Sequence, residues 1–220
     1  MAAYNARVFP YALVTIAATA ALLLAEQRDS RIGVWIAKPI AAAGFIGAAV
    51  ANGALDSVYG EWILAGLVLS FFGDVLLIPH DAKRAFLAGL VSFLLGHLAY
   101  TGAFALRGLD TTATAIAAVP VAGASIVALR YLWPHVQSRA PKMQRPVLAY
   151  LAVISTMLVC AAGTVGRGGD LRILVGAIAF YVSDLAVARQ RFVAPSFTNK
   201  LWGLPLYFGA QLLLAATVSR

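Results

Sequence analysis

Eight apolar segments, each 18 to 22 residues long, divide this chain of 220 residues. A helix needs about 20 mainly apolar residues to cross the hydrocarbon core of a bilayer. Lipid offers no partner for backbone polar groups, so segments of this length are expected to be helices. The segments are Val8–Ala25, Val34–Ala51, Glu61–Pro79, Ala85–Leu106, Thr111–Leu129, Pro146–Gly163, Leu171–Arg189 and Leu201–Val218. They predict an all-α, polytopic membrane helix bundle of about eight transmembrane helices.

The composition agrees with a membrane protein. Hydrophobic residues make up 61% of the chain and charged residues only 12%, against about half and about a quarter in soluble domains. The connections between the segments are short, so residues 1–220 are expected to form a single integral membrane domain. Cys160 is the only cysteine, which rules out an internal disulfide. Arg7 before the first segment would suit a signal peptide, but the length of that segment favours a retained span.

The positive charges predict the topology. Eight spans place both termini on one side, together with the connections after the second, fourth and sixth spans. That side carries five basic residues, Arg7, Arg107, Arg167, Arg172 and Arg220. The other side carries twelve, namely Arg28, Arg31, Lys38, Lys83, Arg84, Arg130, Arg139, Lys142, Arg145, Arg189, Arg191 and Lys200. The positive-inside rule makes the second side cytoplasmic and puts both termini outside, which we expect in a bacterial inner (plasma) membrane. Because the net charge of +8 gathers at span ends, we expect no nucleic-acid partner.

Three ionisable residues lie inside the apolar segments at one depth. Asp74 and Asp184 are each five residues from the cytoplasmic end of their segments, or ~7 Å deep. Lys38 is four residues in from the same side, or ~6 Å deep. Charged groups inside a membrane are costly and usually face a bundle interior or a cavity. We therefore expect these three side chains to line one polar cavity.

Four further polar side chains lie deeper. His97 and Gln211 fall ~15–18 Å from the cytoplasmic ends, near the midplane of the bilayer. Tyr100 shares a helix face with His97, and Tyr207 shares one with Gln211, since residues three or four apart are neighbours on a helix. We predict that His97, Tyr207 and Gln211 border the deeper end of the same cavity.

Each of these residues also has a purely structural interpretation. The aspartates could form hydrogen bonds between helices or an ion pair with Lys38, and Lys38 could instead extend toward the interface. His97 could be a satisfied core histidine. A single deep histidine and a single cysteine give poor support for a zinc site, and neither a nucleophile elbow nor a phosphate-binding loop is present. The prediction is therefore a protein with no metal and no cofactor.

Taken together, these motifs resemble the YhhN family of membrane proteins, which includes the lysoplasmalogenases. The resemblance rests on Lys38-Pro39, Gly73-Asp74-x-x-Leu77, the run GLVSFLLGHLAY from Gly89 to Tyr100, Ser183-Asp184, and Tyr207-x-x-x-Gln211. It implies about eight spans and hydrolysis of the vinyl ether bond of lysoplasmalogens. The matching positions are Lys38, Asp74, His97, Tyr100, Asp184, Tyr207 and Gln211. One departure is Val187, which stands where the motif of the seventh span would suggest leucine.

The chemistry of that reaction suits two buried carboxyl groups. Vinyl ether hydrolysis begins with proton transfer to carbon, which needs a carboxylic acid that is still protonated near neutral pH, and burial favours that form. A second, ionised carboxylate could stabilise the cation and then activate water. We therefore predict Asp74 and Asp184 as catalytic, without assigning acid and base. Lys38, His97, Tyr100, Tyr207 and Gln211 are predicted to bind a lysophospholipid substrate, with Lys38 or rim arginines at its phosphate.

Two other classes of function stay open. In a transporter, the same carboxylates would carry protons or bind a solute, and the 110-residue spacing of Asp74 and Asp184 would suit two related halves. In a structural membrane protein without turnover, neither carboxylate would be needed for activity. Membrane lipids surround the protein in every case.

Overall fold

The structure, a computed structural model, describes residues 2–79 and 82–219, and the side chains of the first helix from Val8 onward. Eight α-helices occupy most of this part of the chain, which contains no strand. They are α1 (Ala2–Gln27), α2 (Arg31–Ala51), α3 (Val58–Leu76), α4 (Lys83–Leu106), α5 (Thr111–Arg139), α6 (Gln144–Val165), α7 (Leu171–Ala188) and α8 (Phe197–Ala215). The turn η1 (Ala54–Asp56) precedes α3, η2 (Pro141–Met143) precedes α6, and the π-helical turn η3 (Arg189–Val193) continues α7. The predicted all-α bundle is confirmed.

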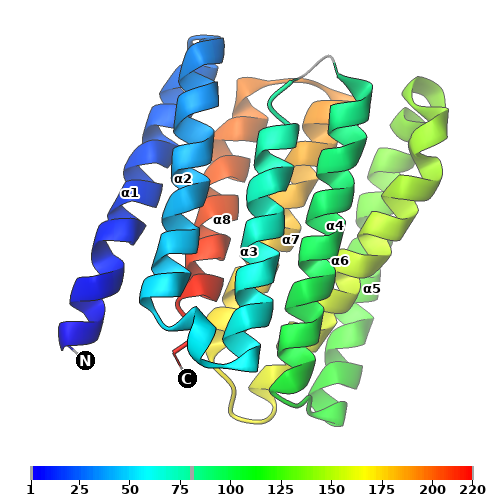
Figure 1. The fold of residues 1–220 in the computed structure, drawn as a ribbon. Helices are drawn as coiled ribbons and strands as arrows, with labels where there is room; N and C mark the ends of the chain where they lie inside the picture. Colours follow the sequence, from blue (N-terminus) through cyan, green and yellow to red (C-terminus); the bar gives the residue numbers. More distant parts are fainter. Residues whose placement is uncertain (1, 80–81, 220) are drawn as a thin grey trace.

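Seven of the described helices, α1 to α7, are long and apolar enough to cross a membrane. The remaining described helix, α8, contains Asn199, Lys200 and Gln211 and is therefore less apolar. It nevertheless lies in the bundle against α7, α1 and α2 (Figure 1). The protein is thus an integral, multi-pass membrane protein, while the eighth span stays a prediction.

The helices alternate in direction. Both ends of the chain lie at one end of the bundle, and the connections α1–α2, α3–α4, α5–α6 and α7–α8 lie at the other (Figure 1). We call the latter the connection end; it holds the helix ends that carry most of the basic residues. Side-chain caps define several helix starts, since Ser30, Ser57 and Asp110 accept hydrogen bonds from amides of the first turn. The predicted contributions of Arg7 and Arg220 to the charge bias lie outside the described side chains.

Helices α3 and α4 pack closely because glycines form the contact. A methyl group added at Gly66 would lie 2.3 Å from the ring of Tyr100, and one at Gly73 would lie 2.6 Å from the ring of Phe93. Small residues let helix backbones approach in a membrane, where packing rather than the hydrophobic effect drives association. The rings of Tyr100 and Phe93 therefore occupy the space into which a side chain at Gly66 or Gly73 would extend.

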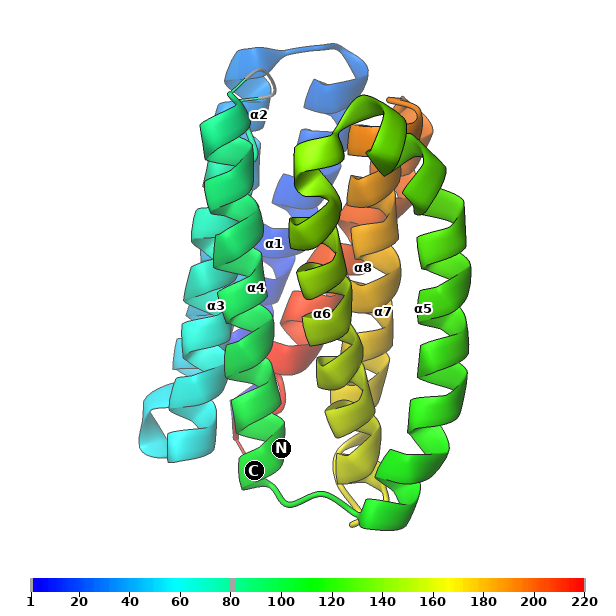
Figure 2. The ribbon, with the colours of Figure 1, turned by 90° about the vertical axis from the view of Figure 1, so that its right-hand side faces the viewer.

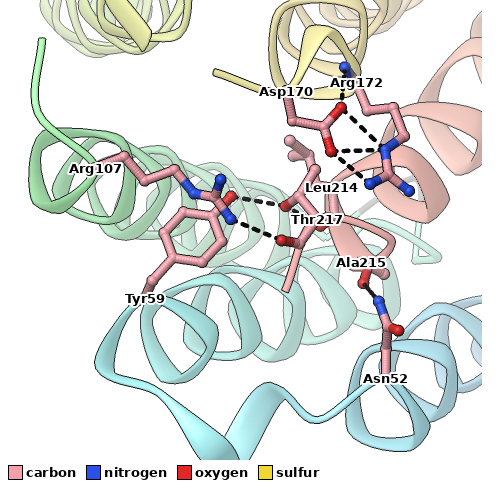
Figure 3. A network of polar contacts seen from close by, with 8 residues as sticks. All are labelled: Asn52, Tyr59, Arg107, Asp170, Arg172, Leu214, Ala215 and Thr217. Carbon is pink, nitrogen blue, oxygen red and sulfur yellow. Dashed lines mark hydrogen bonds and ion pairs between the residues drawn. The ribbon is translucent and has the colours of Figure 1, made fainter. Parts of the chain in front are cut away.

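A polar network ties the end of α8 to three other helices (Figure 3). It lies at the end of the bundle where α2, α4 and α8 end, opposite the connection end (Figure 1). Asn52 donates to the carbonyl of Ala215 at 3.0 Å, and the hydroxyls of Tyr59 and Thr217 are 2.7 Å apart. Arg107 donates to the carbonyl of Thr217 at 2.8 Å and lies over the ring of Tyr59. These contacts anchor α8 to α2, α3 and α4, and so help to fix the rotation of its polar residues.

Replacing Gly66 with alanine is expected to lower the free energy of unfolding by ~1–3 kcal/mol, the usual range for overpacking, because the ring of Tyr100 must move. The matched control is Gly123→Ala on α5, where nothing lies within 4 Å of the added methyl group. Unfolding of both variants in detergent would be compared with the original protein. Equal stability of the two variants would contradict the close packing of α3 on α4.

Candidate active site

A cavity of about 810 Å³ extends from the connection end into the bundle. Its walls come from α3, α4, α5, α6, α7 and α8, with Lys38 contributed by α2, and most of its lining side chains are apolar. The charged side chains on the wall are Lys38, Asp74, Asp184, Arg191 and Lys200. The prediction that Lys38, Asp74 and Asp184 line one cavity is therefore confirmed.

Asp74 on α3 has a cationic partner. Its carboxylate lies 3.2 Å from the ammonium group of Lys38 on α2, which also donates to the Asp74 carbonyl at 3.2 Å. The hydroxyl of Tyr207 on α8 donates to the other carboxylate oxygen at 2.6 Å. Asp74 is 2% exposed, so these two partners replace the water that a free carboxylate would have. Lys38 extends inward, and the alternative that it snorkels to the interface is wrong.

A chain of hydrogen bonds continues from Tyr207 away from the cavity. The amide nitrogen of Gln211 donates to the Tyr207 hydroxyl at 3.2 Å, and Tyr100 donates to the Gln211 carbonyl oxygen at 2.7 Å. Tyr100 and Gln211 are completely buried. This chain links α4 to α8 and sets the direction of the Tyr207 hydroxyl toward Asp74.

Asp184 on α7 has a different environment. The hydroxyl of Tyr150 on α6 donates to its carboxylate at 2.6 Å. His97 Nε2 lies 3.7 Å from the same oxygen and is buried without a hydrogen-bond partner. His97 Nδ1 is 2.7 Å from the carbonyl of Phe93, so Nδ1 carries a proton and donates it there. In neutral His97, Nε2 is therefore an acceptor that faces Asp184.

The deeper part of the prediction needs correction. Tyr207 lines the cavity, but His97, Tyr100 and Gln211 do not. The ring of Phe180 is fully buried and packs against the rings of His97, Tyr100 and Tyr207. Aromatic side chains therefore fill the depth at which we expected a polar funnel. His97, Tyr100 and Gln211 support the residues on the wall instead of forming it.

Sequence reasoning missed Tyr150, which holds Asp184. A usable signal was present, because Tyr150 lies four residues into the segment Pro146–Gly163, counted from its cytoplasmic end. That is the depth of Lys38, Asp74 and Asp184, at ~6–7 Å. The same depth count that identified the charged residues would have included this tyrosine.

The two carboxyl groups are therefore not equivalent. Asp74 faces a lysine and a tyrosine, whereas Asp184 faces a tyrosine and the acceptor nitrogen of His97. A cation stabilises an ionised carboxylate, and a neutral acceptor suits a protonated one. The arrangement can thus hold one carboxylate and one carboxylic acid on the same cavity wall. Among the described residues, no group of three or more His, Cys, Asp or Glu side chains could hold a metal ion.

The fold and the cavity define a class, the polytopic helical membrane proteins with paired intramembrane carboxyl groups at one cavity. Comparison with known families identifies the group within that class: residues 33–218 match the YhhN family, and the chain belongs to it. The resemblance inferred from the motifs is confirmed.

Several relatives have an assigned activity. The lysoplasmalogenase of Mycobacterium bovis is 32% identical over 162 residues, 71% of this chain and 59% of that protein. Lysoplasmalogenase TMEM86A of Bos taurus is 30% identical over 159 residues, 70% of this chain and 63% of that protein. Lysoplasmalogenase TMEM86B of Rattus norvegicus is 32% identical over 160 residues, 72% of this chain and 62% of that protein. The matches thus span about three fifths of the relatives' length. No solved structure matches the chain significantly.

Replacing Lys38 with methionine is expected to lower the free energy of unfolding by ~3–5 kcal/mol, because the Asp74 carboxylate then stays buried without its cation. The double variant Lys38→Met, Asp74→Asn should recover most of that loss, since no unpaired charge remains. Unfolding in detergent would measure both. Equal losses in the single and double variants would show that the ion pair does not hold α2 against α3.

Proposed function

We propose that this protein is a membrane-embedded hydrolase that cleaves the vinyl ether bond of lysoplasmalogens. The products would be a fatty aldehyde and a glycerophospho-headgroup. The names of the relatives support this proposal. The observation that carries it is the pair of unequal carboxyl groups, Asp74 and Asp184, on one largely apolar cavity.

In the proposed reaction, Asp184 is the acid. Its proton moves to the vinyl carbon that is not bonded to oxygen. The vinyl carbon bonded to oxygen then becomes the centre of an oxocarbenium ion. Tyr150 donates to Asp184 and keeps the carboxyl group oriented, and both Tyr150 and Asp184 line the cavity. His97 Nε2 faces the same carboxyl oxygen and, as an acceptor, would favour the protonated form of Asp184 before the substrate binds.

Asp74 is the proposed base. Its carboxylate, kept ionised by Lys38, would stabilise the oxocarbenium ion and accept a proton from the attacking water. Addition of that water gives a hemiacetal, which breaks its carbon–oxygen bond to release the aldehyde and the glycerol hydroxyl. The proton gained by Asp74 equals the proton lost by Asp184, so exchange with water restores the starting state.

The headgroup would lie at the mouth of the cavity. Lys38 is partly buried beside Asp74, whereas Arg191 and Lys200 are the other cations on the wall, and either could hold a lipid phosphate. Lys200 also pairs with Glu26 of α1 at 2.5 Å. With the phosphate there, the vinyl ether would lie beside Asp184, on the wall of the same cavity.

Purified protein incubated with a lysoplasmalogen is expected to release fatty aldehyde. The variants Asp184→Asn and Asp74→Asn should each lower kcat by ~10²–10⁴-fold, the usual range for lost acid–base catalysis. The matched control is Asp110→Asn, because Asp110 caps α5 at the opposite end of the bundle and asparagine caps helices equally well. The control should keep its activity.

The alternative functions give different results in the same assay. Absence of aldehyde together with solute uptake into vesicles would support a transporter. Aldehyde release that survives both substitutions would contradict the roles of Asp74 and Asp184.

We also propose that the connection end faces the cytoplasm of a bacterium with an inner membrane, because that end holds the larger share of Lys and Arg. Reporter fusions inserted near Lys142 should then report a cytoplasmic position, and fusions after Ser219 an external one. The reverse pattern would contradict the proposed orientation. A further fusion at the N-terminus tests the number of spans, because N- and C-terminal reporters on opposite sides of the membrane would contradict eight.

A further inference from the structure

The cavity is open sideways as well as at the connection end. Val127 and Tyr131 on α5 line it and are 69% and 40% exposed. Val182 and Val187 on α7 also line it and are 39% and 41% exposed. Because these side chains are so widely exposed and α5 lies at the margin of the bundle (Figure 2), this part of the cavity wall reaches the outer surface. We call this opening, between residues 127–131 of α5 and residues 182–187 of α7, the side window.

The side window exists because α5 stands at the margin of the bundle (Figure 2). Its main contacts are with α6 and with the turns η2 and η3, rather than with α7 itself. No residue in the most apolar part of α5 is buried. The residues on both sides of the window are mostly apolar, and at membrane depth they face hydrocarbon.

Two clusters hold α5 in place and bound the window. Toward the connection end, Leu132 and Val136 of α5 form a buried cluster with Phe192 of η3. Toward the middle of the bundle, the Ser125 hydroxyl lies 3.0 Å from that of Tyr181 and 2.9 Å from that of Ser155. The window therefore has a fixed upper and lower edge, and the level of Asp184 falls between them.

We propose that the side window is a lateral portal for the hydrocarbon chain of the lysophospholipid substrate. The chain enters from the bilayer between α5 and α7 and stays in the window while the vinyl ether lies beside Asp184. This proposal rests on the proposed function, because it places the ether at the carboxyl groups.

The short depth of the cavity beyond Asp184 favours a lateral path for the chain. On α7 the lining ends at Tyr181, less than one helical turn, or ~5 Å, beyond Asp184. On α6 it ends at Ile154, about one turn beyond Tyr150. A lipid chain spans about half of the hydrocarbon core, or ~15 Å. The blind end of the cavity is therefore too short for the chain, and the side window offers the remaining length.

The test narrows the window with a large side chain. Ala128→Trp fills the α5 wall of the cavity, and Ala122→Trp is the matched control, since Ala122 is exposed on α5 and does not line the cavity. With a long-chain lysoplasmalogen, kcat/KM of Ala128→Trp should fall about tenfold or more. With a water-soluble analogue whose alkenyl chain has only a few carbons, it should change less than about twofold. The control should resemble the original protein with both substrates.

Equal effects on the long and short substrates, or no effect on either, would overturn the portal. A second measurement does not depend on turnover or on the folding of the variant. A saturated ether lysophospholipid with a photoreactive group in mid-chain should label residues 127–131 or 182–187 of the original protein. Labels confined to α3, α4 or α8 would overturn the portal. Labels at the window without aldehyde release from any substrate would support the portal and contradict the proposed reaction.

Discussion

A carboxyl group at membrane depth has no water around it unless the protein admits some, and this constraint shapes the whole bundle. Asp74 on α3 forms an ion pair with Lys38 of α2 and accepts a hydrogen bond from Tyr207 of α8. Asp184 draws Tyr150 from α6, and His97 of α4 lies close by. Satisfying two carboxyl groups therefore requires six helices to meet, and the place where they meet is the cavity.

The partners also make the two carboxyl groups different, although both lie at one depth. A lysine at 3.2 Å favours the ionised form of one of them, while a histidine nitrogen that can only accept in its neutral form suits a protonated neighbour. Acid–base chemistry needs such a pair with unequal proton affinity. The buried chain through Gln211 and Tyr100 fixes the direction of the Tyr207 hydroxyl toward Asp74.

The position of α5 reflects the weak hydrophobic drive for helix association in lipid. In water, a helix with no buried residue along its apolar stretch would collapse onto the bundle. In a membrane, α5 needs only a few contacts, such as the hydroxyls of Ser125 and Tyr181 and the apolar cluster around Phe192. The cost of an opening beside Asp184 is correspondingly low, which is what the proposed lateral portal requires.

The sequence by itself determined the helices and the depths of the polar residues. Both depend on local geometry, because segment length sets the span and the rise per residue sets the level of each side chain. Lys38, Asp74 and Asp184 could therefore be placed at one level, and the same count would have found Tyr150. Only the tertiary structure decided the partners. Tyr207 meets Asp74 across 133 residues of sequence, and the ring of Phe180 packs against His97, which does not reach the cavity wall. The rotation of each helix and the choice of its neighbours depend on contacts between distant segments, which no local pattern encodes.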